Sequence, residues 1–579
     1  MSRFFSRDLY PVLAIVFLSV YLFFFWLGGN GLWNADEGRY AEGGREMFVS
    51  GDFLVPTIDG LPRINKPPLI YWLDAVSYSI FSVNEFAARF FPALFALIGV
   101  VMAYYFGKMS WNRRAGFIAG VVLATCGQYI VLARVIVTDM VLASLMALAI
   151  FFWFRGYKSP RSGGINYILF YIFCGLAVLT KGPLGLIVPF LAIVPYLAVT
   201  GELKRIKEMR PIVGVILILL ISLPWFLLIE RRYPGYLQYF FVEQNFLAFF
   251  KPGIHHGRPF YYTVGYLFAG MFPWSLFFLY LVFRLFKIGF GNIRKVESGL
   301  LFFILWLALA FLFFTVSKSK SSTYLQPVYL PVAVLVGWLF DIVIREAIPG
   351  ETNKGMIVGV VLILILVGVG GVYVSGNPTF YLELEHTEEI LNVIPMVFLI
   401  LIGIVFAVLV LLMLYFAIRG RNIAVVFLVA LMNIITLPVL IYGSEIYEDR
   451  WSSKGVILQA MPLIEEKTQV VAIKNLKIDV AFYTGRAVKV VGDDFDGTFA
   501  RVENRIGVAK SMGGELERNV EDIFLKHLFM DYDKFSEMLN REPVVGFAET
   551  SVFDRMPDII KSKVKVIAKN YELVAFTNR

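Results

Sequence analysis

Apolar runs of about 20 residues recur from residue 9 to residue 443, and they restrict the possible folds more than any other feature of the sequence. A run of this length lets one α-helix cross the roughly 30 Å of hydrocarbon in a lipid bilayer. Of the 579 residues, 58% are hydrophobic and only 17% are charged, which leaves too little polar surface for a soluble protein. The chain is therefore predicted to be a polytopic α-helical membrane protein.

The runs predict about thirteen transmembrane helices. The predicted spans are residues 9–29, 84–107, 115–132, 137–155, 166–180, 183–200, 211–230, 262–286, 298–317, 324–345, 355–375, 391–418 and 422–443. The first run is too long and too rich in Phe for a cleaved signal peptide, so we expect it to remain as a span.

Basic residues between the runs predict the orientation of these helices, because cytoplasmic loops carry an excess of Lys and Arg. If the N-terminus with Arg3 and Arg7 is cytoplasmic, every second loop is basic as well. These loops contain Lys108, Arg113 and Arg114; Arg155, Lys158 and Arg161; residues 202–210; Arg284, Lys287, Arg294 and Lys295; Arg345 and Lys354; and Arg419 and Arg421. The net charge of +9 thus reflects topology rather than nucleic-acid binding. An odd number of spans places the residues after 443 on the outer side.

The composition changes after the last apolar run, and residues 444–579 are predicted to form a soluble α/β domain. The sequences TQVVAIK (468–474) and AVKVVG (487–492) are typical of short strands. Residues 520–539 have the spacing of an amphipathic helix, and residues 563–578 resemble a terminal hairpin. The region has no phosphate-binding loop and no metal-ligand spacing. We expect it to cap, or dock on, the outer face of a membrane domain formed by residues 1–443.

Two predicted outer loops, residues 30–83 and 231–262, are much longer than a turn requires, and long loops are often functional. The first loop holds a group of charged and aromatic residues: Asp36, Glu37, Arg39, Tyr40 and Lys66. Asp36 is also explained as a carboxylate at the start of a helix, where the helix dipole favours it. Lys66, which precedes two prolines close to the lipid headgroups, suits a phosphate, but it could equally anchor a helix to anionic lipid.

More polar residues are predicted at the outer ends of other spans: Arg134, Asp139, Lys181, His255, His256, Arg258, Lys318, Lys320 and Tyr324. Charges within or beside apolar runs are costly, and they usually mark function or a buried pair. A purely structural pair of Asp139 with Arg134 or with Lys181 is the alternative. His255 and His256 are a weak metal signal, because adjacent histidines do not readily bind one ion from a regular helix.

These residues are all expected on the outer face, where carboxylates lie beside many cations at the depth of the headgroups. Transfer of a group from a lipid phosphate needs such a site. The cations bind the phosphate leaving group and stabilise its charge, and a carboxylate orients or deprotonates the acceptor.

Several segments resemble, in the same order, the ArnT-like lipid A glycosyltransferases, which belong to the wider protein O-mannosyltransferase group of GT-C membrane enzymes. These segments are NADEGRYAEGGREMFVSGDFLVP followed by KPPLIYW, then ARVIVTDMVLA, LTKGPLGL, HHGRPFYY with FPWS, and SKSKSSTYLQPVYLP. The resemblance covers roughly residues 30–340. Beyond them, the C-terminal region is similar to the family only in its placement.

The resemblance implies a GT-C fold and an inverting glycosyltransferase on the periplasmic face of the bacterial inner membrane. The donor would be a polyprenyl-phosphate-linked sugar, usually aminoarabinose on undecaprenyl phosphate, and the acceptor would be lipid A. The implied catalytic residues are Asp36, its companion Asp139, and Glu37. The implied substrate-binding residues are Arg39, Tyr40, Lys66, Arg134, Lys181, His255, His256, Arg258, Lys318, Lys320 and Tyr324.

The sequence departs from the family pattern at two places. Asn65 stands where family members often have a Glu that helps to bind a metal with a histidine, so a bound zinc is disfavoured. No cofactor is predicted with certainty, and a divalent metal stays open with weak support. Around Lys318 the family more often has one lysine followed directly by an apolar residue and Tyr. Which of Lys318 and Lys320 acts on the substrate is therefore left open.

Two other functions stay open at this stage. A protein O-mannosyltransferase-like enzyme would share the scaffold and the polyprenyl-phosphate sugar but would deliver the sugar to protein. A lipid flippase or transporter would need a polar track through the bilayer and symmetry between the two halves of the chain, and the sequence shows neither.

Overall fold

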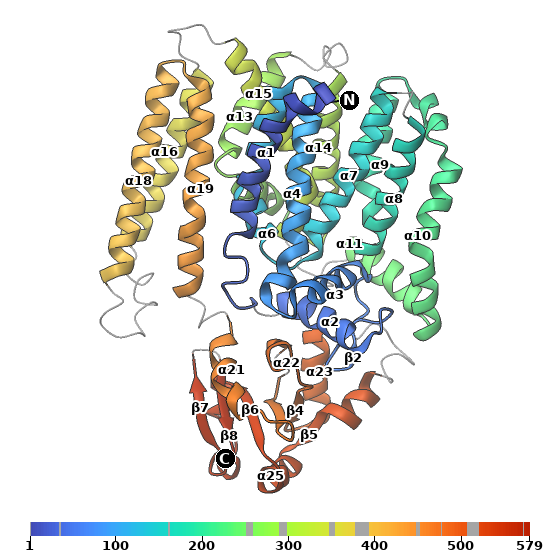
Figure 1. Ribbon diagram of the computed structural model, residues 1–579, viewed down its shortest axis with the longest axis vertical. Coiled ribbons are helices and arrows are strands. Elements are labelled where there is room, and N and C mark those ends of the chain that lie inside the picture. Colours follow the sequence, from blue (N-terminus) through green and yellow to red (C-terminus); the bar gives the residue numbers. More distant parts are fainter. Residues whose placement is uncertain are drawn as a thin grey trace.

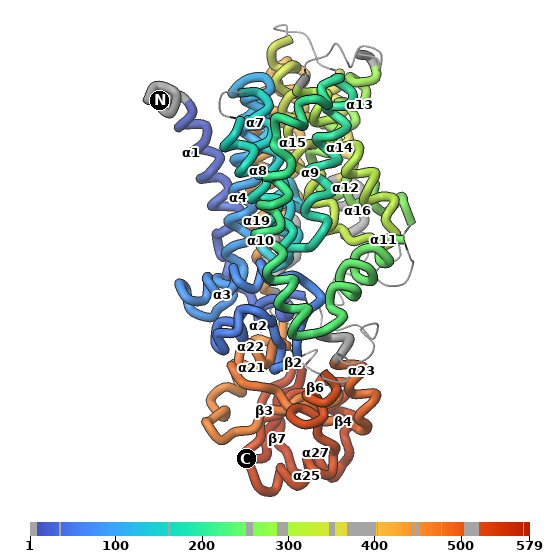
Figure 2. The backbone as a smooth tube through the Cα atoms, turned by 90° about the vertical axis from the view of Figure 1, so that its right-hand side faces the viewer, coloured from blue at the N-terminus to red at the C-terminus, as the bar shows by residue number. Residues whose placement is uncertain are grey.

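The computed structural model describes residues 2–33, 36–159, 163–250, 259–288, 298–346, 354–376, 393–446, 452–475, 478–506, 520–570 and 573–579. Long helices run side by side along most of the molecule, and a β-sheet lies beyond one end of them (Figures 1 and 2). The N-terminus lies at the end of the helices opposite the sheet, as Figure 1 shows.

The long helices follow the predicted apolar runs. They are α1 (Ser2–Phe24), α4 (Glu85–Ser110), α7 (Thr138–Lys158), α8 (Gly163–Lys181), α9 (Leu184–Val199), α10 (Pro211–Arg232), α14 (Ser298–Val316), α15 (Gln326–Arg345), α16 (Lys354–Gly376), α18 (Val393–Ile418) and α19 (Asn422–Ile446). Among the described residues, 6 helices are each long and apolar enough to cross a membrane, and 2 bent pairs of helices pass the same test together. The chain is a multi-pass helical membrane protein, but the predicted number of thirteen spans is not established by helix length.

Two predicted spans are broken helices. The span expected at 115–132 consists of α5 (Arg113–Ala124) and α6 (Gly127–Ala133), which are bent by 64°, and the span at 262–286 consists of α12 (Tyr261–Gly270) and α13 (Ser275–Ile288), bent by 113°. The two breaks contact each other. The Cys126 thiol donates to the Gly270 carbonyl oxygen at 3.0 Å, and the Trp274 indole N–H donates to Thr125 Oγ1 at 3.0 Å. These bonds satisfy polar groups at the breaks, as an apolar surrounding requires.

Small residues bring α4, α5 and α15 close together. A β-carbon on Gly107 of α4 would lie 2.8 Å from the Cα atom of Gly116 of α5, and one on Gly337 of α15 would lie 2.7 Å from the Ala115 carbonyl oxygen. Membrane helices use such residues because packing, rather than the hydrophobic effect, drives their association.

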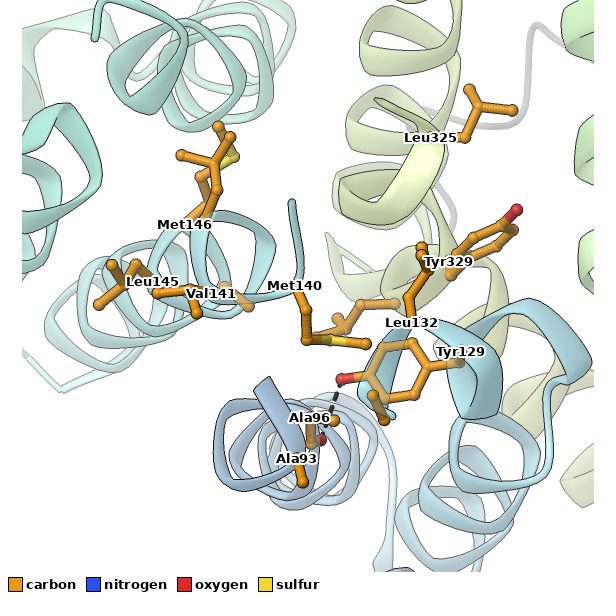
Figure 3. Close-up of a cluster of buried hydrophobic side chains, with 14 of the residues drawn as sticks. Ala93, Ala96, Tyr129, Leu132, Met140, Val141, Leu145, Met146, Leu325 and Tyr329 are labelled. Carbon is orange, nitrogen blue, oxygen red and sulfur yellow. Dashed lines mark hydrogen bonds between the residues drawn. The ribbon is translucent and has the colours of Figure 1, made fainter. Parts of the chain in front are cut away.

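The short helix α6 fills the space between α4, α7 and α15, as Figure 3 shows. Its Tyr129 and Leu132 side chains lie among Ala96, Met140 and Tyr329 (Figure 3), and all five are buried. The Tyr129 hydroxyl donates to the Ala96 carbonyl oxygen at 3.0 Å, so its polar atom is satisfied within this apolar core.

The first long loop forms a small layer between the helices and the sheet. It contains α2 (Asp36–Ser50), the paired strands β1 (Thr57–Ile58) and β2 (Leu61–Pro62), and α3 (Leu69–Phe81). Its Tyr40 and Met47 side chains are buried within the protein. The Tyr78 hydroxyl donates to the Ala41 carbonyl oxygen at 3.0 Å, which fixes α3 against α2.

The C-terminal region contains a 6-stranded sheet with the order β5-β4-β3-β6-β8-β7. Its strands are β3 (Gln469–Ile473), β4 (Lys489–Gly492), β5 (Phe529–Asp531), β6 (Val544–Glu549), β7 (Lys565–Lys569) and β8 (Leu573–Thr577). Strands β5, β4, β3 and β6 are parallel, whereas β8 pairs antiparallel with both β6 and β7. The helices of this region are α21 (Lys454–Ala460), α22 (Ile478–Thr484), α23 (Phe495–Ile506), α25 (Tyr532–Arg541), α26 (Thr550–Phe553) and α27 (Asp558–Lys561).

The predicted strands at 468–474 and 487–492 and the terminal hairpin at 563–578 are confirmed. The single helix predicted at 520–539 is wrong, because β5 interrupts it and joins the edge of the sheet beside β4. Asp531 then starts α25, since its side chain accepts a hydrogen bond from the Lys534 amide at 2.7 Å. We propose a division of the chain into residues 1–443 and 444–579, since α19 is the last long apolar helix and the sheet begins at Gln469.

Candidate active site

Asp36 is the first residue of α2, and its carboxylate is accessible, with 71% of the side chain exposed. Arg39 Nη1 lies 2.8 Å from Asp36 Oδ1, one helical turn further on. An exposed pair of this kind contributes little to stability. The Asp36 carboxylate is therefore open to a substrate and carries a cation beside it.

Glu37, the next residue, is in a very different environment, because its side chain is only 1% exposed. It accepts hydrogen bonds from Arg89 Nε and Nη2 of α4 at 2.9 and 2.7 Å. The Trp33 and Ile136 amides donate to the same carboxylate at 2.7 and 3.0 Å. With its acceptor positions filled, Glu37 joins the start of α2 to α4 and to the α6–α7 connection. We therefore leave Glu37 out of the catalytic group.

Arg134 follows α6 and holds the end of α1. Its guanidinium donates to the carbonyl oxygens of Leu22, Phe23, Phe25 and Trp26 at 3.2, 3.4, 2.8 and 3.3 Å. A cation satisfies the free carbonyl groups at a helix C-terminus and interacts favourably with the helix dipole. This arrangement gives Arg134 a structural role, so we do not include it among the substrate-binding residues.

Asp139 pairs with Lys181, which is the second of the two pairs considered from the sequence. Lys181 Nζ lies 2.6 Å from Asp139 Oδ1, and it also lies 4.3 Å from the centroid of the Tyr324 ring. The first turn of α7 provides Asp139, the last residue of α8 is Lys181, and Tyr324 lies in the turn before α15. Residues from three distant segments thus meet at one point.

Lys66 lies in the link between β2 and α3 and is half-buried. No hydrogen bond or ion pair joins it to any residue that the structure describes. Burial, together with the charges of Lys181 and Arg63, lowers the pKa of the Lys66 ammonium to about 7. The carboxylates of Asp139 and Asp36 act in the opposite direction. The residues predicted at 36, 66, 139 and 181 therefore share one electrostatic environment.

Arg63 belongs to the same group, although the sequence analysis did not select it. It is 2% exposed, its Nε donates to the Tyr71 hydroxyl at 2.8 Å, and its guanidinium lies 5.2 Å from the centroid of the Tyr40 ring. Tyr40 is therefore a buried support for Arg63 in this structure. Arg63 lies three residues before Lys66 on the same short link, and this position could have identified it from the sequence as a further cation of the site.

A cavity of about 370 Å³ opens beside these cations. Lys66, Lys181 and Tyr324 line its polar part, together with Asn65, Ser317 and Ser319. The Asn65 side-chain carbonyl oxygen is buried and has no hydrogen-bond partner among the described residues. The rest of the lining is strongly aromatic: Phe240, Phe241, Phe246, Phe249, Phe250, Phe313 and Phe314. The cavity thus has a cationic part and an aromatic part.

Lys318 and Lys320 are not among the residues that line this cavity. The Lys320 ammonium donates to the Ser317 carbonyl oxygen, and Lys320 is buried, whereas Lys318 is exposed and its amide donates to the Phe249 carbonyl oxygen at 2.9 Å. The serines on either side of Lys318 face the cavity instead. Both lysines fix the loop that carries those serines.

His255, His256 and Arg258 lie outside the described residues. Within the described ranges, no group of three or more His, Cys, Asp or Glu side chains is arranged to hold a metal ion. The residues that the structure brings together are thus Asp36, Arg39, Arg63, Lys66, Asp139, Lys181 and Tyr324.

A second cavity, of about 870 Å³, lies between α13, α15 and α16. Apolar side chains form most of its wall, and its charged residues are Arg284, Glu346 and Lys354. Arg284 Nη2 is paired with Glu346 Oε2 at 2.9 Å. None of the residues predicted for the site lies in its lining, whereas Lys66, Lys181 and Tyr324 line the cavity described above.

Known proteins are similar to this chain in sequence and in fold. A family model described as dolichyl-phosphate-mannose-protein mannosyltransferase matches residues 11–240. The undecaprenyl phosphate-alpha-4-amino-4-deoxy-L-arabinose arabinosyl transferase of Enterobacter sp. (strain 638) is 32% identical over 313 residues, which are 53% of this chain and 55% of that protein. The protein of the same name from Aeromonas salmonicida is 32% identical over 308 residues. The chain thus matches about half the length of these relatives.

Solved structures match over nearly the whole chain. The crystal structure of ArnT from Cupriavidus metallidurans bound to undecaprenyl phosphate has a TM-score of 0.76 and 22% sequence identity, with 98% of each chain covered. The apo structure of the same protein has a TM-score of 0.75, 21% identity and the same coverage. The chain thus has the GT-C fold of ArnT, and its sequence is similar to the arabinosyl transferases over about half of its length.

Proposed function

We propose that this protein is an inverting glycosyltransferase that takes a sugar from a polyprenyl-phosphate donor. The proposal rests on the cavity beside Lys66, because its cationic part matches the phosphate of such a donor and its aromatic part matches the lipid chain. Lys66 and Lys181 suit the phosphate, since ammonium groups bind it by charge-assisted hydrogen bonds. The phenylalanine-lined part suits an isoprenoid chain. The names of the relatives support undecaprenyl phosphate as the lipid and an aminoarabinose-like sugar as the transferred group.

The proposed reaction breaks the bond between the anomeric carbon and the phosphate oxygen of the donor. The acceptor oxygen forms the new bond from the opposite face of the sugar, and the bonding electrons leave with the lipid phosphate. Lys66, Lys181, Arg39 and Arg63 stabilise the negative charge that grows on this leaving group. Asp139 keeps Lys181 in place, and the Asn65 oxygen is available to a sugar hydroxyl.

Asp36 is the proposed catalytic carboxylate because it is accessible next to the cationic group. For a hydroxyl acceptor it accepts the proton as the new bond forms. For a phosphate acceptor, such as a phosphate of lipid A, no proton needs to be removed, and Asp36 orients the acceptor. We propose lipid A as the acceptor, with the reaction on the periplasmic face of the bacterial inner membrane. In this orientation the N-terminus is cytoplasmic and the C-terminal sheet periplasmic.

Transfer of a labelled sugar in proteoliposomes tests the proposal. The protein is supplied with labelled polyprenyl-phosphate sugar and lipid A, and the expected product is labelled lipid A. Asp36→Asn should lower the rate at least about 100-fold, the contribution typical of a positioned acid or base, while the protein remains folded. Asp52→Asn is the matched control, because Asp52 lies in the same loop and is exposed, and its Oδ1 accepts from the Leu54 and Val55 amides, bonds that the asparagine oxygen can also accept. Absence of labelled product with the unaltered protein would overturn the proposal.

The family model favours a second candidate, an enzyme that delivers the sugar to protein. This candidate uses the same donor cavity and the same Asp36, which would then act as a base toward a serine or threonine hydroxyl. The same assay separates the two, because label then appears in a protein fraction and not in lipid. Label in neither fraction, together with movement of the donor across the bilayer, would instead indicate a flippase.

A further inference from the structure

The segment that leads into α2, residues 25–33, carries the start of the helix on which Asp36 lies. On the side of the long helices, Arg134 holds Phe25 and Trp26, and Arg89 holds the residues that follow. Arg89 of α4 donates to the carbonyl oxygens of Leu27, Asn30 and Gly31 at 3.1, 2.9 and 2.7 Å, in addition to its bonds with Glu37. The position of Asp36 therefore depends on bonds made by the residues before it.

The C-terminal region holds the same segment from the other side. The Leu32 amide donates to the Tyr483 hydroxyl of α22 at 2.9 Å, and that hydroxyl donates to Glu85 Oε1 at 3.1 Å. Lys454 Nζ lies 2.6 Å from Glu85 Oε1. Glu85 and Arg89 are four residues apart on α4 and so lie on the same face of that helix. We call Leu32, Tyr483, Glu85 and Lys454 the docking cluster.

The docking cluster lies next to a direct contact between α22 and α2. A β-carbon on Gly38 would lie 3.6 Å from Ile478 Cγ2 and 3.7 Å from the Asp479 amide nitrogen. Near the same place, the Val488 amide donates to Asp59 Oδ1 at 2.8 Å. The C-terminal region thus contacts the residues on both sides of the start of α2, but none of these bonds reaches the Asp36 carboxylate itself.

We propose that Tyr483 is a positioning residue for Asp36, through which the C-terminal region sets the catalytic geometry of the membrane domain. The proposal rests on the proposed function, in which Asp36 acts on the acceptor. The Tyr483 hydroxyl fixes the Leu32 amide, four residues before Asp36, and it ties that amide to α4 through Glu85. Loss of the hydroxyl removes the bond at Leu32, between Gly31 held by Arg89 and Trp33 held by Glu37, and lets the Asp36 carboxylate shift. A displacement of about 1 Å at a reacting group is enough to lower a rate substantially.

The donor cavity does not depend on this cluster. Lys66, Lys181 and the phenylalanine-lined part come from the link between β2 and α3, from α8, from α14 and from residues 240–250. The hydrogen bonds of the Tyr483 hydroxyl, to Leu32 and Glu85, reach none of these segments. The cluster is therefore expected to act on turnover and to leave donor affinity unchanged. That separation distinguishes positioning from a general loss of structure.

Tyr483→Phe removes only the hydroxyl and keeps the ring. In the full-length protein we expect kcat to fall about 10-fold, while the Kd of sugar-free polyprenyl phosphate stays within about 2-fold. Combined with Asp36→Asn, the same change should add no further loss, because it acts through a carboxylate that is already absent. Tyr532→Phe is the matched control: Tyr532 of α25 has a hydroxyl without a partner in the described residues, so its removal should change neither quantity.

Two results would overturn the proposal: an unchanged kcat in Tyr483→Phe, or an equal loss in the wild-type and Asp36→Asn backgrounds. Amide hydrogen exchange tests it independently of activity. Exchange at residues 25–40 should rise in Tyr483→Phe and stay unchanged in Tyr532→Phe, and unaltered exchange in Tyr483→Phe would contradict the account. If the wild-type protein transfers no sugar at all, the proposed function fails, and the exchange result still decides whether the C-terminal region fixes the start of α2.

Discussion

The two ends of the helical part both carry charged side chains, but they use them differently. At the end with the N-terminus, buried carboxylates have several partners each. Asp8 accepts from the Tyr104 hydroxyl at 2.9 Å and pairs with Arg113 Nε at 2.9 Å and with Lys108. Nearby, Asp341 forms bonds with Asn112, Arg114 and Arg345 at 2.8, 2.6 and 2.8 Å. These contacts tie α1, α4, α5 and α15 together.

At the opposite end, cations outnumber the carboxylates near them. Lys66, Lys181 and Arg63 lie close enough to influence one another, and Lys66 has no partner among the described residues. An aromatic cavity adjoins the cations, and the Asp36 carboxylate is open to solvent. Carboxylates paired with cations at one end hold helices together. At the other end the cations exceed the carboxylates, so an anionic ligand would be bound favourably there.

The Glu37–Arg89 pair is expected to give the largest effect. It lies at the end of the helices that carries the candidate site, but it is a buried ion pair like those at the opposite end. Arg89→Met leaves a buried Glu37 carboxylate without its partner, which typically costs about 3–5 kcal/mol of folding free energy. We expect a loss of this size in denaturant unfolding in detergent micelles. Arg39→Met, which removes the partner of an exposed carboxylate, should cost much less. Similar stabilities for the two variants would break the contrast.

Lys66→Met sharpens the contrast in the other direction. Removal of an unpaired ammonium should leave the stability unchanged and weaken the binding of polyprenyl phosphate by about 30-fold, since a hydrogen bond to a charged group contributes about 1.5–3 kcal/mol. Lys108→Met at the N-terminal end should show the reverse, with a lower stability and an unchanged affinity. Isothermal titration and unfolding of both variants measure the four quantities. An affinity that falls equally in the two variants would mean that the cation near Lys66 has no special role.

The smallest expected effect is a pH dependence of donor binding. The pKa of Lys66 is about 7 in the empty site, below its ordinary value of 10.5, so the ammonium is charged below pH 7 and increasingly neutral above it. A bound phosphate favours the charged form and raises the pKa, so affinity is constant below the pKa and falls as the pH rises through it. Between pH 7 and pH 8 we expect a loss of up to about 5-fold. In Lys66→Arg this dependence should disappear, because the guanidinium stays charged. Binding that is equally strong at pH 7 and pH 9 in the unaltered protein would count against Lys66 as the phosphate ligand.

The positions of most helices could be predicted from the sequence, because an apolar run of about 20 residues is typical of a membrane-spanning helix and of few other structures. The breaks could not. Thr125, Gly127 and Pro273 lie at the breaks, but proline also occurs inside the continuous helices α10 and α15 and so does not identify a break. The bonds that stabilise the breaks join segments that are more than 100 residues apart. For the same reason the phenylalanine-lined cavity was not predicted: helices that are apolar on all sides do not reveal which side faces lipid.

The candidate site could be predicted as a set of residues but not as a set of roles. Asp36 and Glu37 are adjacent acidic residues at a helix start, and only the fold shows that one is exposed and the other is bound to Arg89. Asp139 had two possible partners in the sequence. In the structure, Arg134 donates to carbonyl oxygens at the end of α1, and Lys181 pairs with Asp139. Tyr483 had no sequence signal, because its contact with Leu32 exists only once the C-terminal region docks.

The location of the bound lipid tests the central claim most directly. A polyprenyl phosphate with a photoreactive group close to its phosphate can be cross-linked to the protein in vesicles, and the labelled peptides can be identified by mass spectrometry. We predict labels at the segments that contain Phe249 and Phe313, and their loss when unlabelled polyprenyl phosphate competes. Competed labels at Leu279 and Val358, in the cavity between α13, α15 and α16, would contradict the account.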